Sequence, residues 1–164
     1  AANQDALWAA VDVIQDNFGK SDLISDVWPF TQTNYYNKET GEHILRQFVS
    51  LERLFEPDRL AEVKNKTNKL EQKLSEKLKL SVPRPVNLDP GVIEPSKLIL
   101  ATTKNYSHRI YIGQKMYAEV TLIYHKGTWQ PFDYTYADYR QECYLDFFSK
   151  VRAKLCEQLR ELEQ

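Results

Sequence analysis

Apolar residues recur three or four positions apart in three parts of the chain, a period that predicts amphipathic helices. The first stripe lies between Asn3, a capping residue, and Gly19, a helix stop; the second follows Pro57; the third runs from about Glu142 to Glu163. The stripes are Leu7, Val11, Ile14 and Phe18; Leu60, Val63, Thr67, Leu70 and Leu74; and Leu145, Phe148, Arg152 (by its aliphatic stem), Leu155, Leu159 and Leu162.

A period of two, typical of half-buried strands, marks other segments. Leu45, Val49 and Leu51 alternate with polar neighbours and follow the turn-like "NKETGE" at residues 37–42. The proline-rich "SVPRPVNLDPGVIEPSK" predicts a loop with at most a short strand around Val86. The β-branched residues of "PSKLILATTK" favour a strand, but Pro95 suits a first helical turn, so we predict a short helix there.

The register of the next hairpin follows from its apolar residues, which are all even-numbered: Ile110, Ile112, Met116, Ala118, Val120, Leu122 and Tyr124. They share one face only if the numbers of paired residues sum to an even number. A three-residue loop, Gly113-Gln114-Lys115, meets this condition and places Arg109 opposite Glu119. Turn statistics favour a two-residue loop, but that loop would split the apolar face. The other face then carries Arg109, Tyr111, Tyr117, Glu119 and Thr121.

A turn at Lys126-Gly127 returns "TWQPF" as a third strand, with Trp129 on the apolar face. These elements predict an α+β fold, a mainly antiparallel sheet with helices packed on it. A ferredoxin-like core plus a C-terminal β-meander is one arrangement that fits. The length of 164 residues, without repeat or linker, predicts a single domain over residues 1–164.

Composition narrows the classes of partner. The chain has 22 basic and 23 acidic residues, a formal net charge of −1, which disfavours a nucleic-acid partner. We interpret the lysines of the second helix, Lys64, Lys66, Lys69 and Lys73, as a solvated face. No apolar run approaches 18 residues, so no membrane span is expected.

The cysteines, Cys143 and Cys156, both fall in the last predicted helix. Thirteen residues of helix separate them by roughly 20 Å, beyond the reach of a disulfide. Two unpaired thiols suit a cytoplasmic protein. Three scattered histidines match no zinc spacing, and no G-x-x-x-x-G-K-[ST] loop occurs, so neither a metal nor a cofactor is expected.

Three stretches, "FVSLERLFEPDRLAEVKNKTNKLE", "RPVNLDPGVIEPSKLILATTKNYSHRIYIGQKMYAEVTLIYHKGTW" and "YTYADYR", together resemble a prokaryotic family catalogued as domain of unknown function 4416. The resemblance spans almost the whole chain and implies no particular activity. The recurring family signature is similar here to Asn87-Leu88-Asp89-Pro90-Gly91, Lys97, Thr102-Thr103-Lys104, His108-Arg109-Ile110-Tyr111, Glu119-Val120-Thr121 and Asp138-Tyr139-Arg140.

The polar hairpin face suggests a site for a small molecule that bears a phosphate or a carboxylate, with enzymatic activity left open. Arg109 offers a planar fork of donors and Lys104 a point charge, while Glu119 would accept a proton or orient a substrate hydroxyl. His108 is one residue out of phase and is expected on the apolar face or at the edge of the sheet. The candidate catalytic residues are Glu119 and His108; the candidate ligand-binding residues are Asn87, Asp89, Lys97, Lys104, Arg109, Tyr111 and Thr121.

Three alternatives stay open at this point. Arg109–Glu119 and Tyr111–Tyr117 would also serve as ordinary stabilising cross-strand pairs. Ten tyrosines and three tryptophans could supply stacking surfaces to an RNA-related accessory protein. The leucine-striped C-terminal helix could bind a protein partner without any catalysis, and the oligomeric state is left open.

Overall fold

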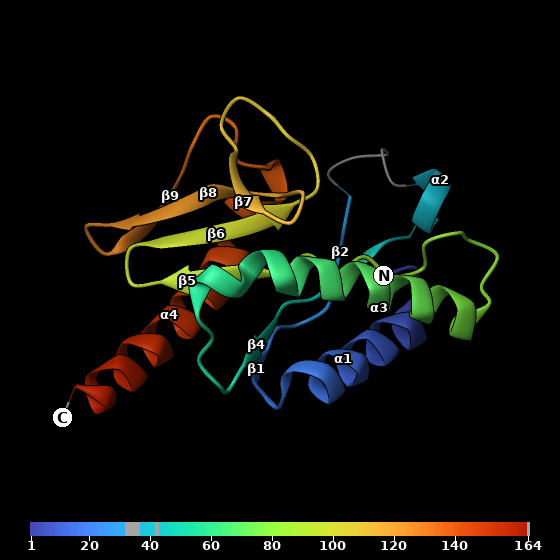
Figure 1. Cartoon of the computed structure of the whole chain (residues 1–164), viewed down its shortest axis with the longest axis horizontal. Coiled ribbons are helices and arrows are strands. Elements are labelled where there is room, and N and C mark those ends of the chain that lie inside the picture. The colour runs from blue at the N-terminus through green and yellow to red at the C-terminus, as the bar shows by residue number, and fades with distance from the viewer. Residues whose placement is uncertain (32–36, 42, 164) are drawn as a thin grey trace. The chain divides into compact units, whose positions relative to one another are not determined.

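The fold is that of a computed structural model, which describes residues 1–31, 37–41 and 43–163. The chain forms two compact units (Figure 1): Ala1–Leu54 with Asn65–Leu88, here unit 1, and Phe55–Lys64 with Asp89–Gln164, here unit 2. The predicted α+β class with antiparallel sheets is confirmed. A single domain over residues 1–164 stays a prediction. Within the described residues, no helix is both long and apolar enough to cross a membrane.

The described residues of unit 1 form two helices, a single helical turn and four short strands. They are α1 (Gln4–Phe18), β1 (Ser21–Ile24), β2 (Trp28–Pro29), α2 (Asn37–Thr40), β3 (Leu45–Arg46), β4 (Val49–Leu51) and the part of α3 (Leu60–Leu78) from Asn65 onward. β1 pairs with β4 and β2 with β3, both antiparallel. A ferredoxin-like core is therefore not confirmed, since the described strands of this unit form two separate two-stranded sheets.

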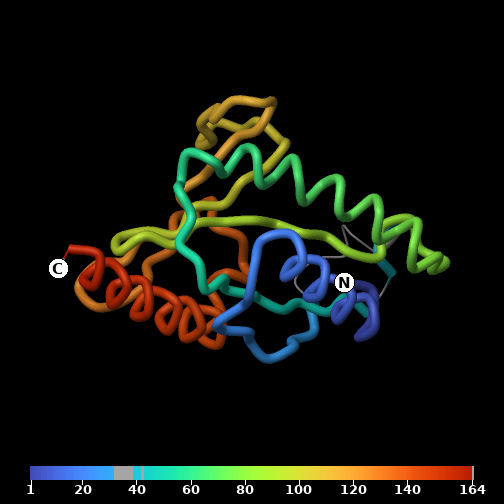
Figure 2. Tube along the Cα trace, turned by 60° about the horizontal axis from the view of Figure 1, so that its bottom comes forward, coloured from blue at the N-terminus to red at the C-terminus, as the bar shows by residue number. Residues whose placement is uncertain are grey.

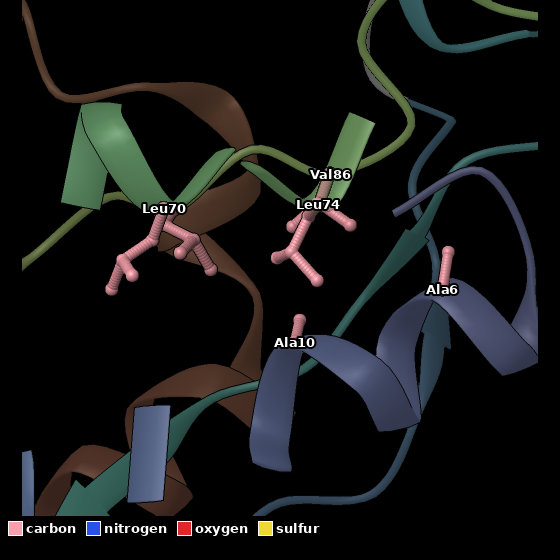
Figure 3. Close-up of a cluster of buried hydrophobic side chains, with 6 residues drawn as sticks. Ala6, Ala10, Leu70, Leu74 and Val86 are labelled. Atoms are coloured by element: carbon pink, nitrogen blue, oxygen red, sulfur yellow. The ribbon is translucent and has the colours of Figure 1, made fainter. Parts of the chain in front are cut away.

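The ends of α1 follow its sequence. The Asn3 side chain accepts a hydrogen bond of 2.9 Å from the amide of Ala6, and Gly19 ends the helix at φ +101°. The core of unit 1 lies between α1 and α3, where Ala6 and Ala10 face Leu70 and Leu74 (Figure 3). Because alanine side chains are small, the backbone of α1 can come close to the leucines of α3.

The predicted strand from Leu45 onward is divided into β3 and β4. Between them, the Ser25 hydroxyl accepts a hydrogen bond of 2.9 Å from the Phe48 amide, which interrupts a continuous ladder. The predicted turn at residues 37–42 includes the short helix α2. Residues 32–36, together with residue 42 of this turn, lie outside the described residues. Val86 lies in a loop and is buried in the core.

Unit 2 is built on a five-stranded antiparallel sheet. Its elements are a 3₁₀ turn η1 (Pro57–Arg59), the first residues of α3, β5 (Gly91–Glu94), β6 (Lys97–Thr102), β7 (Ile110–Gly113), β8 (Met116–His125), β9 (Thr128–Pro131), a second 3₁₀ turn η2 (Ala137–Arg140) and α4 (Glu142–Leu162). The strand order is β5-β6-β8-β7, with β9 also paired to β8. Since β6 pairs along β8 from Tyr117 to Ile123, β7 and β9 share its other edge, so the three strands do not form a simple meander.

The short helix predicted after Pro95 is wrong. Pro95 and Ser96 form the tight turn between β5 and β6, and Glu94 pairs with Lys97 across it. β6 is a central strand, with β5 on one side and β8 on the other. The sheet therefore determines its conformation, and the β-branched residues are the better guide than the proline.

The predicted hairpin register is confirmed at two positions, where Tyr111 pairs with Tyr117 and Ile110 with Ala118. The loop differs from the prediction. Gln114 and Lys115 form a two-residue turn with φ of +53° and +61°, and a bulge before Gly113 absorbs the extra residue. The turn preference and the burial pattern are thus both satisfied.

The even-numbered face of the sheet packs against α4, and the two lie next to each other in Figures 1 and 2. The buried Trp129 ring lies 6.5 Å from that of Phe148, and the Arg152 guanidinium lies 3.6 Å from the centre of the Tyr124 ring. Ile110, assigned to this apolar face, is largely exposed, because β7 is a short edge strand.

Candidate functional site

Glu119 on β8 is a buried carboxylate, with a side chain only 2% exposed. Its Oε2 lies 2.8 Å from Arg109 Nε and 3.1 Å from His108 Nε2, and its Oε1 accepts a longer hydrogen bond of 3.4 Å from the buried Thr121 hydroxyl. The predicted proximity of Arg109 to Glu119 is therefore confirmed, but Arg109 precedes the first residue of β7, so the two residues do not lie on adjacent strands. Burying a charge is costly unless it is paired and hydrogen-bonded, and this carboxylate has partners at both oxygens.

Arg109 links Glu119 to two surface segments. Nη1 donates a hydrogen bond of 3.0 Å to the Lys104 carbonyl oxygen, and Nη2 donates one of 2.9 Å to the Tyr136 hydroxyl. Burial lowers the pKa of Arg109, but the hydrogen bond and charge of Glu119, together with Tyr136, outweigh it and raise the pKa. The guanidinium is thus held charged, and three of its five N–H groups bind within the protein.

The side chain of His108 belongs to this cluster and does not lie on the apolar face, which was one of the two places expected for it; the residue lies just before β7, a strand at the edge of the sheet. It lies in a turn before β7 begins, so the alternation of a strand does not govern its direction. Its ring stacks on Tyr134, with centroids 4.0 Å apart, and meets the Tyr106 ring edge-on at 5.3 Å. When Nε2 carries the proton and donates it to Glu119, Nδ1 is an acceptor.

Residues 132–136, here called the strap, lie over the buried part of β8. The Tyr134 hydroxyl donates to the Val120 carbonyl at 2.9 Å, and the Thr135 hydroxyl donates to the Thr121 carbonyl at 2.6 Å. Burial, followed by the negative charge of Glu119, raises the pKa of Tyr134. The strap accounts for the burial of a face that the sequence pattern marks as polar.

Arg140 fixes the strap from the far end. It donates to the carbonyl oxygens of Phe132, Asp133 and Thr135 at 2.7, 3.1 and 3.2 Å. Sequence reasoning did not assign the strap or Arg140 to the site. The available signal was the "YTYADYR" segment, which served only to identify the family resemblance.

Other candidate residues on the sheet lie at different distances from Glu119. Thr121 joins the network, and Tyr111 is an exposed residue of β7 whose ring lies 5.5 Å from that of Tyr117. Lys97 pairs with Ile123, four residues beyond Glu119, a separation of about 13 Å along a strand. Its ammonium forms an ion pair of 2.5 Å with Glu94, so the structure does not bring Lys97 to the cluster.

Asn87 and Asp89 bind other partners. In unit 1, Asn87 accepts a hydrogen bond from Arg84, whose Nη2 also lies 2.7 Å from Glu71 Oε2. In unit 2, Asp89 accepts a hydrogen bond of 3.1 Å from Lys64 Nζ. Lys64 is almost completely buried, so its assignment to a solvated helix face is wrong.

Cys143 and Cys156 both lie on α4 and are free thiols, as predicted. In the part of the chain that the structure describes, no group of three or more histidine, cysteine or acidic side chains is placed to hold a metal ion.

Comparison with known proteins gives a family and no activity. The sequence model of the family described as Domain of unknown function (DUF4416) matches residues 1–155, so the chain belongs to this family. The search of curated proteins gives no match. The search of solved structures gives none either.

Proposed function

We propose that the surface around His108 binds a small ligand bearing a phosphate or a carboxylate, and that His108 exchanges a proton with it. The observation that carries this proposal is the contact of 3.1 Å between His108 Nε2 and the buried Glu119 carboxylate. A buried ion network of this kind is often no more stabilising than an apolar core. A role in orienting His108 gives a reason for its presence here.

The chemistry follows from the protonation of the imidazole. With its Nε2 proton directed to Glu119, the His108 ring presents Nδ1 as a proton acceptor, and its side chain is 17% exposed. Accepting a proton from a ligand hydroxyl would give an imidazolium, which the Glu119 carboxylate stabilises. Glu119 itself is too deeply buried to touch a ligand, so the proposal gives it a positioning role.

Two side chains at the same surface suit the anionic group. Lys104 is exposed and positively charged at neutral pH. The Tyr136 hydroxyl accepts a hydrogen bond from Arg109, which directs its own proton toward other acceptors. Arg109 donates hydrogen bonds to the Lys104 carbonyl oxygen and to the Tyr136 hydroxyl, and so connects both segments to Glu119. A cytoplasmic location, with reduced thiols, forms part of this proposal.

The test follows thermal stability and the imidazole resonances while inorganic phosphate or citrate is added. We expect either anion to raise Tm and to shift the His108 signals. His108→Gln retains a side-chain donor near Glu119 but lacks Nδ1, and should abolish the shift in Tm. His125→Gln, a change at an exposed histidine at the end of β8, is the matched control and should behave as wild type.

Two results would refute the proposal. One is an unchanged Tm over a wide panel of phosphates, sugar phosphates and carboxylates. The other is a stabilisation by phosphate that survives His108→Gln and Lys104→Gln together, because the anion would then bind elsewhere.

A further inference from the structure

Although the net charge of the whole chain is close to zero, one segment carries more basic than acidic side chains. Residues 95–132 contain five Lys and Arg residues and one acidic residue, Glu119. Glu119 is buried and paired with Arg109, so it contributes little to the surface field. Lys97 is ion-paired with Glu94 and Arg109 with Glu119, and the remaining cations of the segment are Lys104, Lys115 and Lys126. Exposed cations of this kind attract anions over a long range at low salt.

Two exposed tyrosines, Tyr106 and Tyr111, lie within this segment, and a third, Tyr136, lies in the strap that follows it. Tyr106, Tyr111 and Tyr136 are 66%, 58% and 49% exposed. Among the described residues of unit 2, the remaining exposed large apolar side chains are Ile110 and Leu162. The exposed aromatic surface of this unit is thus concentrated at one end of the sheet.

The three rings border the same side of the sheet. Tyr111 pairs with Tyr117, two residues from Glu119 on β8, and so shares its face. The Tyr136 hydroxyl binds Arg109, and the Tyr106 ring contacts His108. We call these three tyrosines the tyrosine face.

An extended peptide added to the edge of β7 is a poor occupant. β7 has four residues, a bulge before Gly113 and a positive φ of +91° at that glycine. Short, bulged edges disfavour the addition of another strand. The occupant must instead offer negative charge to the lysines and flat rings to the tyrosines.

We infer that the tyrosine face binds single-stranded nucleic acid, with bases stacked on Tyr106, Tyr111 and Tyr136 and phosphates near Lys104 and Lys115. Stacking on exposed aromatic rings and contact of cations with the backbone are together the usual basis of such binding. The inference rests on the proposed function in one respect, since both place an anion beside Lys104.

The test measures fluorescence anisotropy of labelled 12-nucleotide oligo-U and oligo-dT as salt increases. We expect binding at low salt that weakens as salt rises, with a slope of about −0.7 per phosphate contacted. Tyr106→Ala and Tyr111→Ala should each raise Kd about tenfold, while the Phe variants at these positions should bind as wild type. Lys104→Glu should also weaken binding, whereas Lys126→Glu, in the β8–β9 turn, is the control.

Three results would overturn the inference: no binding at low salt, equal affinity for double-stranded DNA or poly-glutamate, or affinity for oligonucleotide that is insensitive to both Tyr→Ala changes. Affinity for poly-glutamate alone would indicate an acidic protein partner. The proposed function is tested separately, because stabilisation by inorganic phosphate depends on His108 and should survive the changes at Tyr106 and Tyr111.

Discussion

The burial of Glu119 leads to a quantitative prediction for Glu119→Gln. This change preserves the shape of the side chain and removes its charge. Arg109, whose side chain is only 8% exposed, then loses its counter-charge without gaining access to water. The amide oxygen of Gln can still accept a hydrogen bond from Arg109 or His108, but more weakly than the carboxylate does.

The expected cost is intermediate between two limits. Removing one member of a buried ion pair typically costs about 3–5 kcal/mol, and one hydrogen bond to a charged group contributes about 1.5–3 kcal/mol. Arg109 keeps its hydrogen bonds to the Lys104 carbonyl and to Tyr136, which favours the lower part of this range. We therefore expect Glu119→Gln to lower the free energy of unfolding by about 2–3 kcal/mol.

Urea denaturation of Glu119→Gln, Arg109→Met and the double variant completes a double-mutant cycle. The cost of the double variant should be smaller than the sum of the single costs, since each single change leaves the other group buried without its partner. Glu94→Gln is the matched control, because the Glu94–Lys97 pair is partly exposed, and should cost less than about 1 kcal/mol. If Glu119→Gln costs no more than this control, the carboxylate is not buried and the reasoning about its role is refuted.

Three further predictions concern the core, the strap and the thiols. Leu74→Ala should cost about 2–5 kcal/mol in urea denaturation, because Leu74 is 1% exposed, and a cost below about 1 kcal/mol would contradict its place in the core. Burial and the charge of Glu119 raise the pKa of Tyr134 in the folded chain. The folded state therefore holds the phenol proton more tightly than the unfolded state, and the free energy of unfolding falls as the pH rises above about 10. Tyr134→Phe should reduce that fall, and a pH profile of stability unchanged by the substitution would contradict the raised pKa. Thiol titration under denaturing, non-reducing conditions should find Cys143 and Cys156 both reactive, and a chain without reactive thiols would exclude a reducing compartment.

The sequence predicts the three long helices well, because their determinants are local. Asn3 and Gly19 delimit α1 as expected, and α4 begins at Glu142 and ends within a residue of the predicted position. The hairpin register is also predictable, since a one-residue slip would expose an entire apolar face. These features depend on periodicity and caps that lie within a few residues of each other.

The sequence predicts the site less well, because its contacts are distant along the chain. Arg109 meets Tyr136 across 27 residues, and no periodicity relates the two. The direction of the His108 side chain does not follow from strand alternation, because His108 precedes the first residue of β7. The strap cannot be predicted from periodicity, because it is neither strand nor helix and is held by hydrogen bonds of Tyr134, Thr135 and Arg140 to backbone carbonyl groups.

The position of β8 has a consequence for hydrogen exchange and for the order of folding. β8 has β6 along one edge and β7 and β9 along the other, so few of its amides can open unless the whole sheet separates. Its amides should therefore exchange with solvent more slowly than any others in unit 2. Its hairpin partners are also close in sequence, as with Tyr111 of β7 and Tyr117, or Trp129 of β9 and Tyr124, and such local pairings close quickly. The strand that carries Glu119 would then form early in folding, before the strap covers it. In unfolding, the same strand would open last, after the strap is released.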